Sequence, residues 1–157
     1  MIVVTGGTGH VGNVLVRELL NSGEKVRVVI PSFEDDSPLD GLEVEKVEGD
    51  VLDYTSLIRA FNGADIVYHL AGIVSITSAK KQLLYNVNIN GTKNVIDACL
   101  ECNVKRLVYT SSVHAFVEPP LGTPIVESTE IDPKKVTGDY AKTKATATLE
   151  VKKAIKQ

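Results

Sequence analysis

The sequence predicts an α/β fold built on a doubly wound parallel sheet of about five strands. Short runs rich in Val and Ile alternate along the chain with segments of helical periodicity, which is the pattern of βαβ units whose sheet is buried on both faces. The stretch TGGTGHVG at 5–12 directly follows the first such run, where a strand must turn into a helix. The 157 residues, 43% of them hydrophobic and 24% charged, suffice for one domain, which we expect to span 1–157.

We expect strands at 2–5, 25–30, 43–48, 64–71 and 105–112, and helices at about 10–22, 53–62, 80–102 and from 138 to the end. Asp53 is of a type preferred at helix N-caps, and Gly63 is of a type that ends helices. Right-handed crossovers then give the spatial strand order 3-2-1-4-5. Ligands of such sheets bind beyond the carboxyl ends of the strands where the order reverses, here between the first and fourth strands.

A long connection at about 113–137 follows the fifth strand and carries Pro119, Pro120, Pro124 and Pro133. Loops of this length in compact domains often act as lids or substrate loops. We expect such a function here, with an ordered surface excursion as the alternative.

The net charge, the N-terminal residues and the length of the apolar runs argue against several classes of protein. The net charge of −3 and the lack of a basic cluster argue against nucleic-acid binding, which needs a basic face. Met1 leads directly into an apolar strand without a basic leader, and no apolar run reaches the roughly 18 residues that span a bilayer. We therefore expect a cytoplasmic protein without a membrane segment.

Cys99 and Cys102 have C-x-x-C spacing, which also occurs in redox pairs and in zinc sites. Here the pair lies in a predicted helix that runs into a strand, and no second cysteine pair completes a metal site. We expect ordinary helix residues in a reducing compartment and no bound metal.

Gly6, Gly9 and Gly12 have the spacing G-x-x-G-x-x-G, one residue different from the better-known dinucleotide fingerprint. We expect Gly6 to allow a tight turn, Gly9 to allow the approach of a diphosphate, and Gly12 to allow close packing of the helix on the sheet. A helix that begins near Val11 would direct its free N–H groups at the anion. A tight turn without a ligand is the alternative, and we expect His10 to be a helix-start residue rather than a catalyst.

The type of dinucleotide depends on the end of the second strand, where an acid holds the ribose hydroxyls of NAD and a base accommodates the 2′-phosphate of NADP. Pro31 and Ser32 stand there and carry neither charge. Glu34, Asp35 and Asp36 follow; they would repel a 2′-phosphate if they folded back, and would form a solvated turn if they did not. NAD is therefore favoured, and NADP stays open.

Tyr140 and Lys144, in DYAKTK, are four residues apart and share one face of the last predicted helix. Other short motifs occur in a consistent order: TGGTGHVG, GDVLD after the third strand, HLAG after the fourth, NVNINGT on a helix and YTSS after the fifth. With these motifs the chain resembles the extended short-chain dehydrogenase/reductase family, also called the NAD-dependent epimerase/dehydratase family, over essentially all of its 157 residues. The resemblance is to the N-terminal Rossmann portion of such proteins, of the dihydroflavonol-reductase kind.

The resemblance implies catalytic roles for Ser112, Tyr140, Lys144 and Asn88. Tyr140 would exchange a proton with the substrate oxygen while the nicotinamide exchanges a hydride, and Lys144 would favour the ionised phenol by its charge. Ser112 would hydrogen-bond the substrate oxygen, with Ser111 as the alternative one residue away. Asn88 would stabilise the site or relay a proton, or would instead stabilise a kink in its helix.

The resemblance also implies a set of cofactor contacts. Asp50 would contact the adenine amino group with Val51 beside the ring, and Lys144 would hold the nicotinamide ribose. The implied cofactor-binding set is Gly6, Gly9, His10, Val11, Gly12, Ser32, Asp50, Val51, Leu70, Ala71, Gly72, Tyr140 and Lys144. We expect His69 and His114 to be structural, although His114 is near enough to Ser112 to touch a substrate.

Members of this family continue well past the helix that carries Tyr140, whereas this sequence ends at Gln157. We therefore expect the N-terminal portion of an NAD(P)-dependent reductase or dehydrogenase that acts on a small carbonyl or alcohol. A nucleotide-sugar epimerase or dehydratase is one alternative, disfavoured because SSVHAF lacks the Tyr-Gly pair that often follows the serine. A non-catalytic NAD(P) sensor or an inert fragment is the other. Relatives commonly dimerise through the helices that correspond to 80–102 and 138–156, so we expect a homodimer.

Overall fold

The structure of the chain is a computed structural model, which describes residues 1–74, 81–127 and 129–155. The chain forms two compact units. The first comprises Met1–Ala71 with Asn94–Thr110, and the second comprises Gly72–Lys93 with Ser111–Gln157. The first unit contains the sheet and the glycine-rich turn, and the second contains the residues to which the sequence assigns the catalytic roles.

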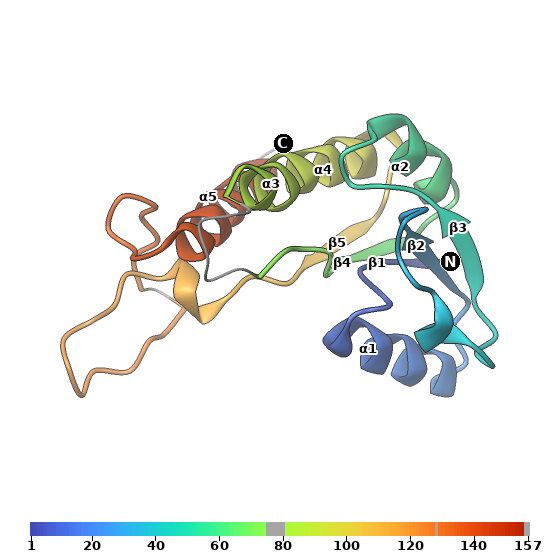
Figure 1. Cartoon of the computed structure of the whole chain (residues 1–157), viewed down its shortest axis with the longest axis horizontal. Coiled ribbons are helices and arrows are strands. Elements are labelled where there is room, and N and C mark those ends of the chain that lie inside the picture. Colours follow the sequence, from blue (N-terminus) through green and yellow to red (C-terminus); the bar gives the residue numbers. More distant parts are fainter. Residues whose placement is uncertain (75–80, 128, 156–157) are drawn as a thin grey trace. The chain divides into compact units, whose positions relative to one another are not determined.

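The first unit contains a five-stranded parallel sheet (Figure 1), which confirms the predicted fold class. Its strands are β1 (Ile2–Thr5), β2 (Val26–Ile30), β3 (Glu45–Glu48), β4 (Ile66–His69) and β5 (Arg106–Tyr109). They lie in the order β3-β2-β1-β4-β5, as predicted. Strand β1 has its predicted bounds, and the other four strands are shorter than predicted, in part because apolar runs continue into turns. Ala64, for example, is buried, but its amide donates to Phe61 O at 2.9 Å in the turn before β4.

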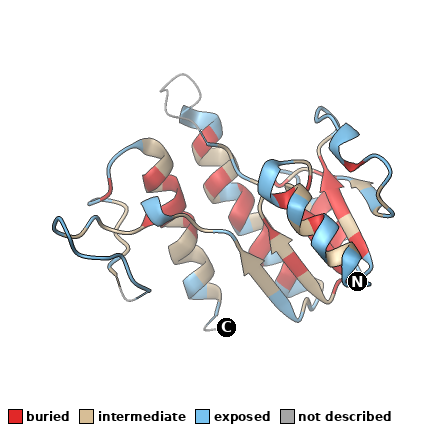
Figure 2. Cartoon of the chain, turned by 90° about the horizontal axis from the view of Figure 1, so that it is seen from below, coloured by how far each residue is buried: buried red, intermediate tan, exposed pale blue. Residues whose placement is uncertain are grey.

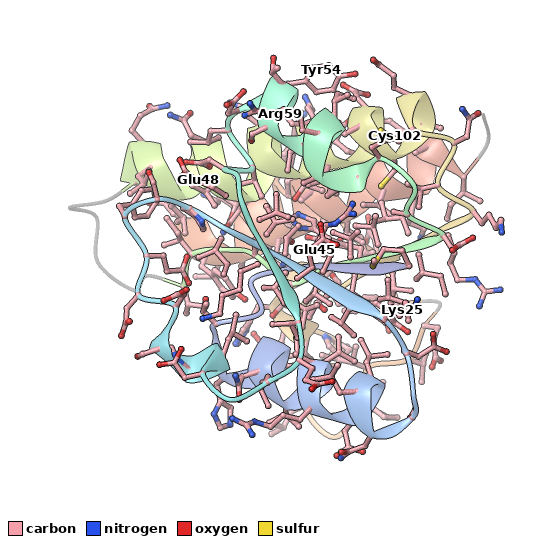
Figure 3. The ribbon with its side chains drawn as sticks, turned by 90° about the vertical axis from the view of Figure 1, so that its right-hand side faces the viewer. Lys25, Glu45, Glu48, Tyr54, Arg59 and Cys102 are labelled. Carbon is pink, nitrogen blue, oxygen red and sulfur yellow. The ribbon has the colours of Figure 1, made fainter. Side chains whose placement is uncertain are left out.

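Helices cover both faces of this sheet. Helix α1 (His10–Asn21) lies on one face, and α2 (Tyr54–Phe61) and α4 (Thr92–Glu101) lie on the other (Figure 1). All four residues of β1 are buried, and buried residues also occur in β2 and β4 and on the helices (Figure 2). One core cluster joins Ile2, Val4, Val16, Val26, Val28, Ile30 and Leu39. Edge strand β3 instead exposes charged side chains such as Glu45 and Glu48 (Figure 3), which discourages pairing with another strand.

The predicted cap of the second helix is confirmed. One carboxylate oxygen of Asp53 accepts hydrogen bonds from the amides of Thr55 at 3.0 Å and Ser56 at 3.2 Å, ahead of α2. Gly63 follows the end of the helix with a left-handed φ of 73°, a conformation that glycine adopts at little cost.

The second unit contains α3 (Lys81–Tyr85), the π-helical segment η3 (Asn86–Gly91), the short 3₁₀ helix η4 (Val113–Ala115) and α5 (Asp139–Ala154). Segments α3, η3 and η4 all pack against α5. The predicted single helix at 80–102 is therefore α3, η3 and α4 in succession, and residue 80 lies outside the described residues. Helix α5 begins at Asp139, one residue later than predicted, and residues 156–157 also lie outside the described residues.

The connection between β5 and α5 has little regular structure. Apart from η4, no helix or strand occurs among its described residues up to α5. Leu121, Ile125 and Val126 are exposed in it, whereas Val136 joins Ala115, Ala141 and Ala145 in a small core of the second unit. The connection is thus anchored at both ends by packing on α5.

Cys99 lies in α4, as predicted, whereas Cys102 directly follows the helix in a turn, and both are free thiols. Burial raises the pKa of the Cys99 thiol to about 12, and burial together with Glu101 raises the pKa of Cys102. Neither thiol is therefore activated as a nucleophile near neutral pH. Among the described residues, no three His, Cys, Asp or Glu side chains form a group that could hold a metal ion. Within the same part of the chain, no helix has the length and apolar character needed to cross a membrane.

Candidate functional site

The turn after β1 requires glycine at its first position. Gly6 has a left-handed φ of 75°, and a Cβ atom there would lie 2.6 Å from the backbone nitrogen of Ala71 in the turn after β4. Real Cβ atoms do not approach backbone this closely, so only glycine fits between the two turns. The predicted role of Gly6 as the residue of the tight turn agrees with this geometry.

The packing roles of the other glycines differ from the prediction. A Cβ atom on Gly12 would lie 2.0 Å from the carbonyl oxygen of Gly6, so this position of α1 packs on the glycine turn and not on the sheet. The glycine that packs on the sheet is Gly7, where a Cβ atom would lie 2.6 Å from Cγ1 of Val28 in β2. The sequence did not predict a role for Gly7, because Gly7 is not one of the three glycines in the G-x-x-G-x-x-G spacing.

The N-terminus of α1 has the features of an anion site. Gly9 is its N-cap and is exposed, with Gly6 O at 3.4 Å as the nearest neighbour of an added Cβ. No side chain caps this helix, and its first turn contains no acidic residue. The amides of His10, Val11 and Gly12 thus have no acceptor within the helix, and the positive end of the helix dipole faces outward. This cradle of backbone N–H groups fits a diphosphate.

A pocket of about 560 Å³ lies at the carboxyl end of β3. It brings together Ser32 and Asp50, two of the predicted cofactor contacts, and its lining is Ser32, Phe33, Val47, Glu48, Gly49, Asp50, Asp53, Ser56 and Arg59. Glu48 and Arg59 mark this edge of the first unit in Figure 3. Asp50 is oriented because its Oδ1 accepts from the Leu52 amide at 2.8 Å. Val51 is buried next to it, and its carbonyl accepts from Asn94 Nδ2 at 2.8 Å.

The acidic run after β2 divides into three separate contacts. The Thr8 hydroxyl, in the glycine turn, donates to the carboxylate of Glu34. Asp35 instead accepts from the backbone amide and the hydroxyl of Ser37, which lower its pKa, and Asp36 pairs with Lys46 at 2.9 Å. Only Glu34 therefore folds back to the glycine turn.

Leu70 and Ala71 lie directly beside the glycine turn. The Leu70 amide donates to Thr5 O at 3.0 Å, and the Ala71 amide donates to Thr5 Oγ1 at 3.3 Å. Gly72 belongs to the second unit, where an added Cβ atom would lie 3.3 Å from Asn88 Oδ1. The first unit thus brings together the glycine turn, Leu70 and Ala71.

Tyr140 and Lys144 lie one turn apart near the start of α5. Lys144 is only 8% exposed, and this burial lowers the pKa of its ammonium group from 10.5 to about 8, because removal from water disfavours the charged form. Tyr140 is half-buried, and the ring of His114 meets its ring edge-on, with 6.3 Å between centroids and an interplanar angle of 74°. The lysine should thus lose its charge at a lower pH than an exposed lysine does.

The two candidate serines have different partners. Ser112 Oγ accepts from the His114 amide at 3.2 Å and caps η4, which places it two residues from the ring that meets Tyr140. Ser111 Oγ is hydrogen-bonded to Thr148 Oγ1 on α5 at 2.7 Å. His114 therefore links Ser112 to Tyr140, whereas the hydroxyl of Ser111 is already engaged on the helix.

Asn88 connects the π-helical segment to two neighbours. Its Oδ1 accepts from the Ile73 amide at 2.8 Å, and its Nδ2 donates to Ile73 O at 2.9 Å and to Thr143 Oγ1 at 3.1 Å. The Thr143 hydroxyl in turn donates to Tyr140 O at 2.8 Å. These bonds favour the helix-stabilising interpretation of Asn88. They also identify Thr143, which the sequence analysis did not single out although it directly precedes the lysine.

The second unit therefore has the groups for proton transfer at an oxygen atom. A phenol, a hydroxyl and a buried ammonium group come from Tyr140, Ser112 and Lys144. Such a set can give or take a proton at a carbonyl or alcohol oxygen while holding that oxygen in place.

The chain is similar in sequence to a described protein family and to curated proteins. A model of the 3-beta hydroxysteroid dehydrogenase/isomerase family matches residues 3–157. The chain is 40% identical to "Sterol demethylase protein B" of Methylococcus capsulatus over 149 residues, which cover 95% of this chain and 45% of that protein. It is 36% identical to "3beta-hydroxysteroid-dehydrogenase/decarboxylase isoform 2" of Arabidopsis thaliana over 157 residues, covering 91% of this chain and 27% of that protein. The chain thus spans less than half the length of these relatives.

Solved structures of similar fold include proteins with bound NAD. A short-chain dehydrogenase/reductase superfamily protein from Agrobacterium tumefaciens, with bound NAD, has a TM-score of 0.81 and 30% identity, covering 96% of this chain and 44% of that one. The UDP-glucose 4-epimerase of Thermus thermophilus, in complex with NAD, has a TM-score of 0.82 and 28% identity, covering 96% of this chain and 49% of that one.

Proposed function

Because the chain belongs to the 3-beta hydroxysteroid dehydrogenase/isomerase family, within the extended short-chain dehydrogenases/reductases, we propose that it is the dinucleotide-binding portion of an oxidoreductase. The reaction interconverts a small-molecule alcohol and the corresponding carbonyl compound with NAD(P). The observation that carries this proposal is Lys144, a lysine only 8% exposed that lies one helical turn from Tyr140. Burial of a lysine is costly, and its position one helical turn from a phenol suits acid/base catalysis.

In the proposed reaction Tyr140 donates its phenolic proton to the carbonyl oxygen during reduction, and takes a proton from the hydroxyl group during oxidation. When bound, the nicotinamide ring supplies or accepts the hydride at the neighbouring carbon. Ser112 donates a hydrogen bond to the same oxygen. Lys144, as ammonium, stabilises the ionised phenol and holds the ribose hydroxyls. Its charge declines above about pH 8, so oxidation, which needs the ionised phenol, should lose this support at higher pH.

The cofactor contacts proposed for the first unit follow its local geometry. The amides of His10, Val11 and Gly12 bind the diphosphate at the uncapped end of α1, and the exposed Gly9 leaves room for it. Ser32, Asp50 and Val51 hold the adenosine end near the pocket after β3. Titration calorimetry with NADH tests this assignment, because Gly9→Val should abolish the heat of binding and Tyr140→Phe should leave it nearly unchanged. Equal NADH binding by wild type and Gly9→Val would contradict it.

We propose NAD as the preferred form of the dinucleotide. The carboxylate of Glu34 is hydrogen-bonded to Thr8 of the glycine turn, and residues 31–33 at the end of β2 include no basic side chain. A carboxylate accepts from ribose hydroxyls and repels a 2′-phosphate. A comparison of NADH and NADPH dissociation constants tests the preference, and tighter binding of NADPH would refute it.

A nucleotide-sugar epimerase is the second candidate, because UDP-glucose 4-epimerases are among the similar structures. The segment SSVHAF at 111–116 lacks the Tyr-Gly pair that often follows the serine in such epimerases, which favours the proposed oxidoreductase. Incubation with UDP-sugars and with alcohols decides between the two: an epimerase isomerises the sugar without net change in NADH, whereas a dehydrogenase produces NADH. A sensor without catalysis would need only the glycine turn, so retention of Ser112, Tyr140 and Lys144 together favours the enzyme.

We further propose a cytoplasmic homodimer that forms through the helical segments at 81–101 and 139–154. Leu83 and Leu100 expose large apolar side chains on the first of these, and free thiols suit a reducing compartment. Analytical ultracentrifugation at micromolar concentration tests the dimer, and a single monomeric species would refute it.

A further inference from the structure

His114 has no role in the proposed reaction, although it contacts two of the residues that carry that reaction. Its imidazole is exposed, and the ring meets the ring of Tyr140 edge-on, with 6.3 Å between the centroids. Its backbone amide donates to Ser112 Oγ at 3.2 Å. His114 is therefore in contact with both groups that are proposed to bind the reacting oxygen of the substrate.

The residue after His114 anchors the short helix η4. Ala115 is 0% exposed and packs with Ala141 and Ala145 of α5 in the small core of the second unit. Ala141 directly follows Tyr140 in the chain. The position of His114 relative to Tyr140 is thus set by a packed core and not by an unattached loop.

The hydrogen bond from the His114 amide also determines what the Ser112 hydroxyl can do. A hydroxyl group accepts through its lone pairs and donates through its single hydrogen. Ser112 Oγ accepts here from a backbone N–H, which leaves its hydrogen available for an acceptor on a ligand. A substrate oxygen that accepts from Ser112 and Tyr140 would therefore be bound in the immediate vicinity of the imidazole.

The ring nitrogens of His114 are not used by the fold. Neither of them makes a hydrogen bond or an ion pair with any residue that the structure describes. The carboxylate of Asp139, directly before Tyr140, is by contrast paired with Lys81 at 3.2 Å. A neutral imidazole has one donor and one acceptor nitrogen. His114 thus offers a ligand a hydrogen bond that the fold itself does not need.

We propose that His114 is a specificity-determining residue, which binds a second oxygen atom of the substrate. The substrate is then an alcohol or ketone with a further oxygen function on a carbon close to the reacting one, as in a hydroxy acid or a hydroxy ketone. A site built to hydrogen-bond such an oxygen discriminates against analogues that lack it. This inference rests on the proposed function and names the substrate class of the same site.

Three ketones of similar shape test the inference, as ligands of the chain saturated with NAD, which cannot reduce them. Acetoacetate carries a carboxylate beyond its carbonyl group, diacetone alcohol carries a hydroxyl there, and methyl isobutyl ketone carries only methyl groups. We would measure their dissociation constants and the thermal midpoint of unfolding for wild type, His114→Leu, His114→Gln and Val113→Ala. Gln keeps a donor and an acceptor, and Val113 is an exposed neighbour in η4 that serves as the control.

The preference for acetoacetate over methyl isobutyl ketone, as a ratio of dissociation constants, should fall by roughly tenfold in His114→Leu, the effect of one lost hydrogen bond to a charged group. The preference for diacetone alcohol should fall by about fivefold, because its hydroxyl is neutral. A fall for only one of the two would restrict the class to hydroxy acids or to hydroxy ketones.

The other variants separate specificity from structure. His114→Gln should retain most of the wild-type preference, and Val113→Ala should retain all of it. The thermal midpoint should stay level throughout, because both side chains are exposed. A merely structural role of His114 would instead lower the thermal midpoint and weaken the binding of all three ketones alike.

Two outcomes would overturn the inference while leaving the proposed function intact. In one, wild type and His114→Leu show the same preferences among the ketones. In the other, His114→Leu weakens the three ketones in equal proportion. A folded wild-type chain that binds no NAD, or that binds NAD and none of the ketones, would instead overturn the proposed function, and this inference with it.

Discussion

Substitution of Lys144 by Met should change how the stability of the protein depends on pH, because it removes the proposed ammonium group of the site. Lys144 is only 8% exposed, and burial lowers the pKa of its ammonium group from 10.5 to about 8. The difference between these two values corresponds to about 3 kcal/mol of unfavourable free energy at neutral pH. Met has a similar length and no titrating group, so the variant should lack the pH dependence of stability that Lys144 contributes.

The sign of the pH dependence is fixed by the lowered pKa. Between about pH 8 and 10.5 the unfolded state holds more protons on Lys144 than the folded state, so wild type gains stability as the pH rises through this window. The Met variant has no such group. The difference in free energy of unfolding between wild type and variant should therefore shift by roughly 2 kcal/mol in favour of wild type between pH 7 and pH 10.

Urea denaturation of both proteins at a series of pH values measures this difference, and other titrating groups cancel in the comparison. Lys152→Met is the control, because Lys152 is an exposed residue on the same helix, and its difference from wild type should stay small and level. A difference in free energy of unfolding between Lys144→Met and wild type that stays constant between about pH 7 and pH 10 would contradict the lowered pKa of Lys144.

Other substitutions test the remaining parts of the account. Tyr140→Phe should lower turnover of an alcohol, followed by NADH absorbance, by about 10²-fold or more, and turnover near the wild-type rate would remove Tyr140 from the acid/base role. Glu34→Arg should shift the ratio of NADPH to NADH affinity upward by roughly tenfold, as measured by cofactor fluorescence; an unchanged ratio would show that Glu34 does not select the cofactor. Asp53→Ala should lower the free energy of unfolding by about 1 kcal/mol through loss of the cap of α2, and denaturation curves that superimpose on wild type would contradict this.

Much of the fold could be predicted because it depends on local patterns. Alternation of apolar runs and helical periods identified all five strands and their order, and Asp53 could be recognised as a cap from its type and position. Strand ends could not be predicted so well, because a buried residue such as Ala64 continues the apolar run after pairing has stopped. The extended short-chain dehydrogenase/reductase resemblance is confirmed by the family match.

Features that depend on contacts between distant segments could not be predicted from the sequence. The π-helical turn at Asn88 depends on hydrogen bonds to Ile73 and Thr143, which are 15 and 55 residues away. The hydrogen bond between Thr8 and Glu34 depends on the path of the loop after β2. The residue pattern does not predict that path. The packing of Gly7 on Val28 likewise needs the pairing of β1 with β2 before it can be recognised.

We propose above that bare amides at the N-terminus of α1 bind the diphosphate of NAD. An amide NMR titration of the isotopically labelled chain with NAD measures this directly, because the signals of those amides report on the bond itself. We expect large shifts at His10, Val11 and Gly12 and little change at the far end of the helix near Leu20. Saturating NAD that leaves the signals of His10 to Gly12 unmoved in a folded protein would contradict it.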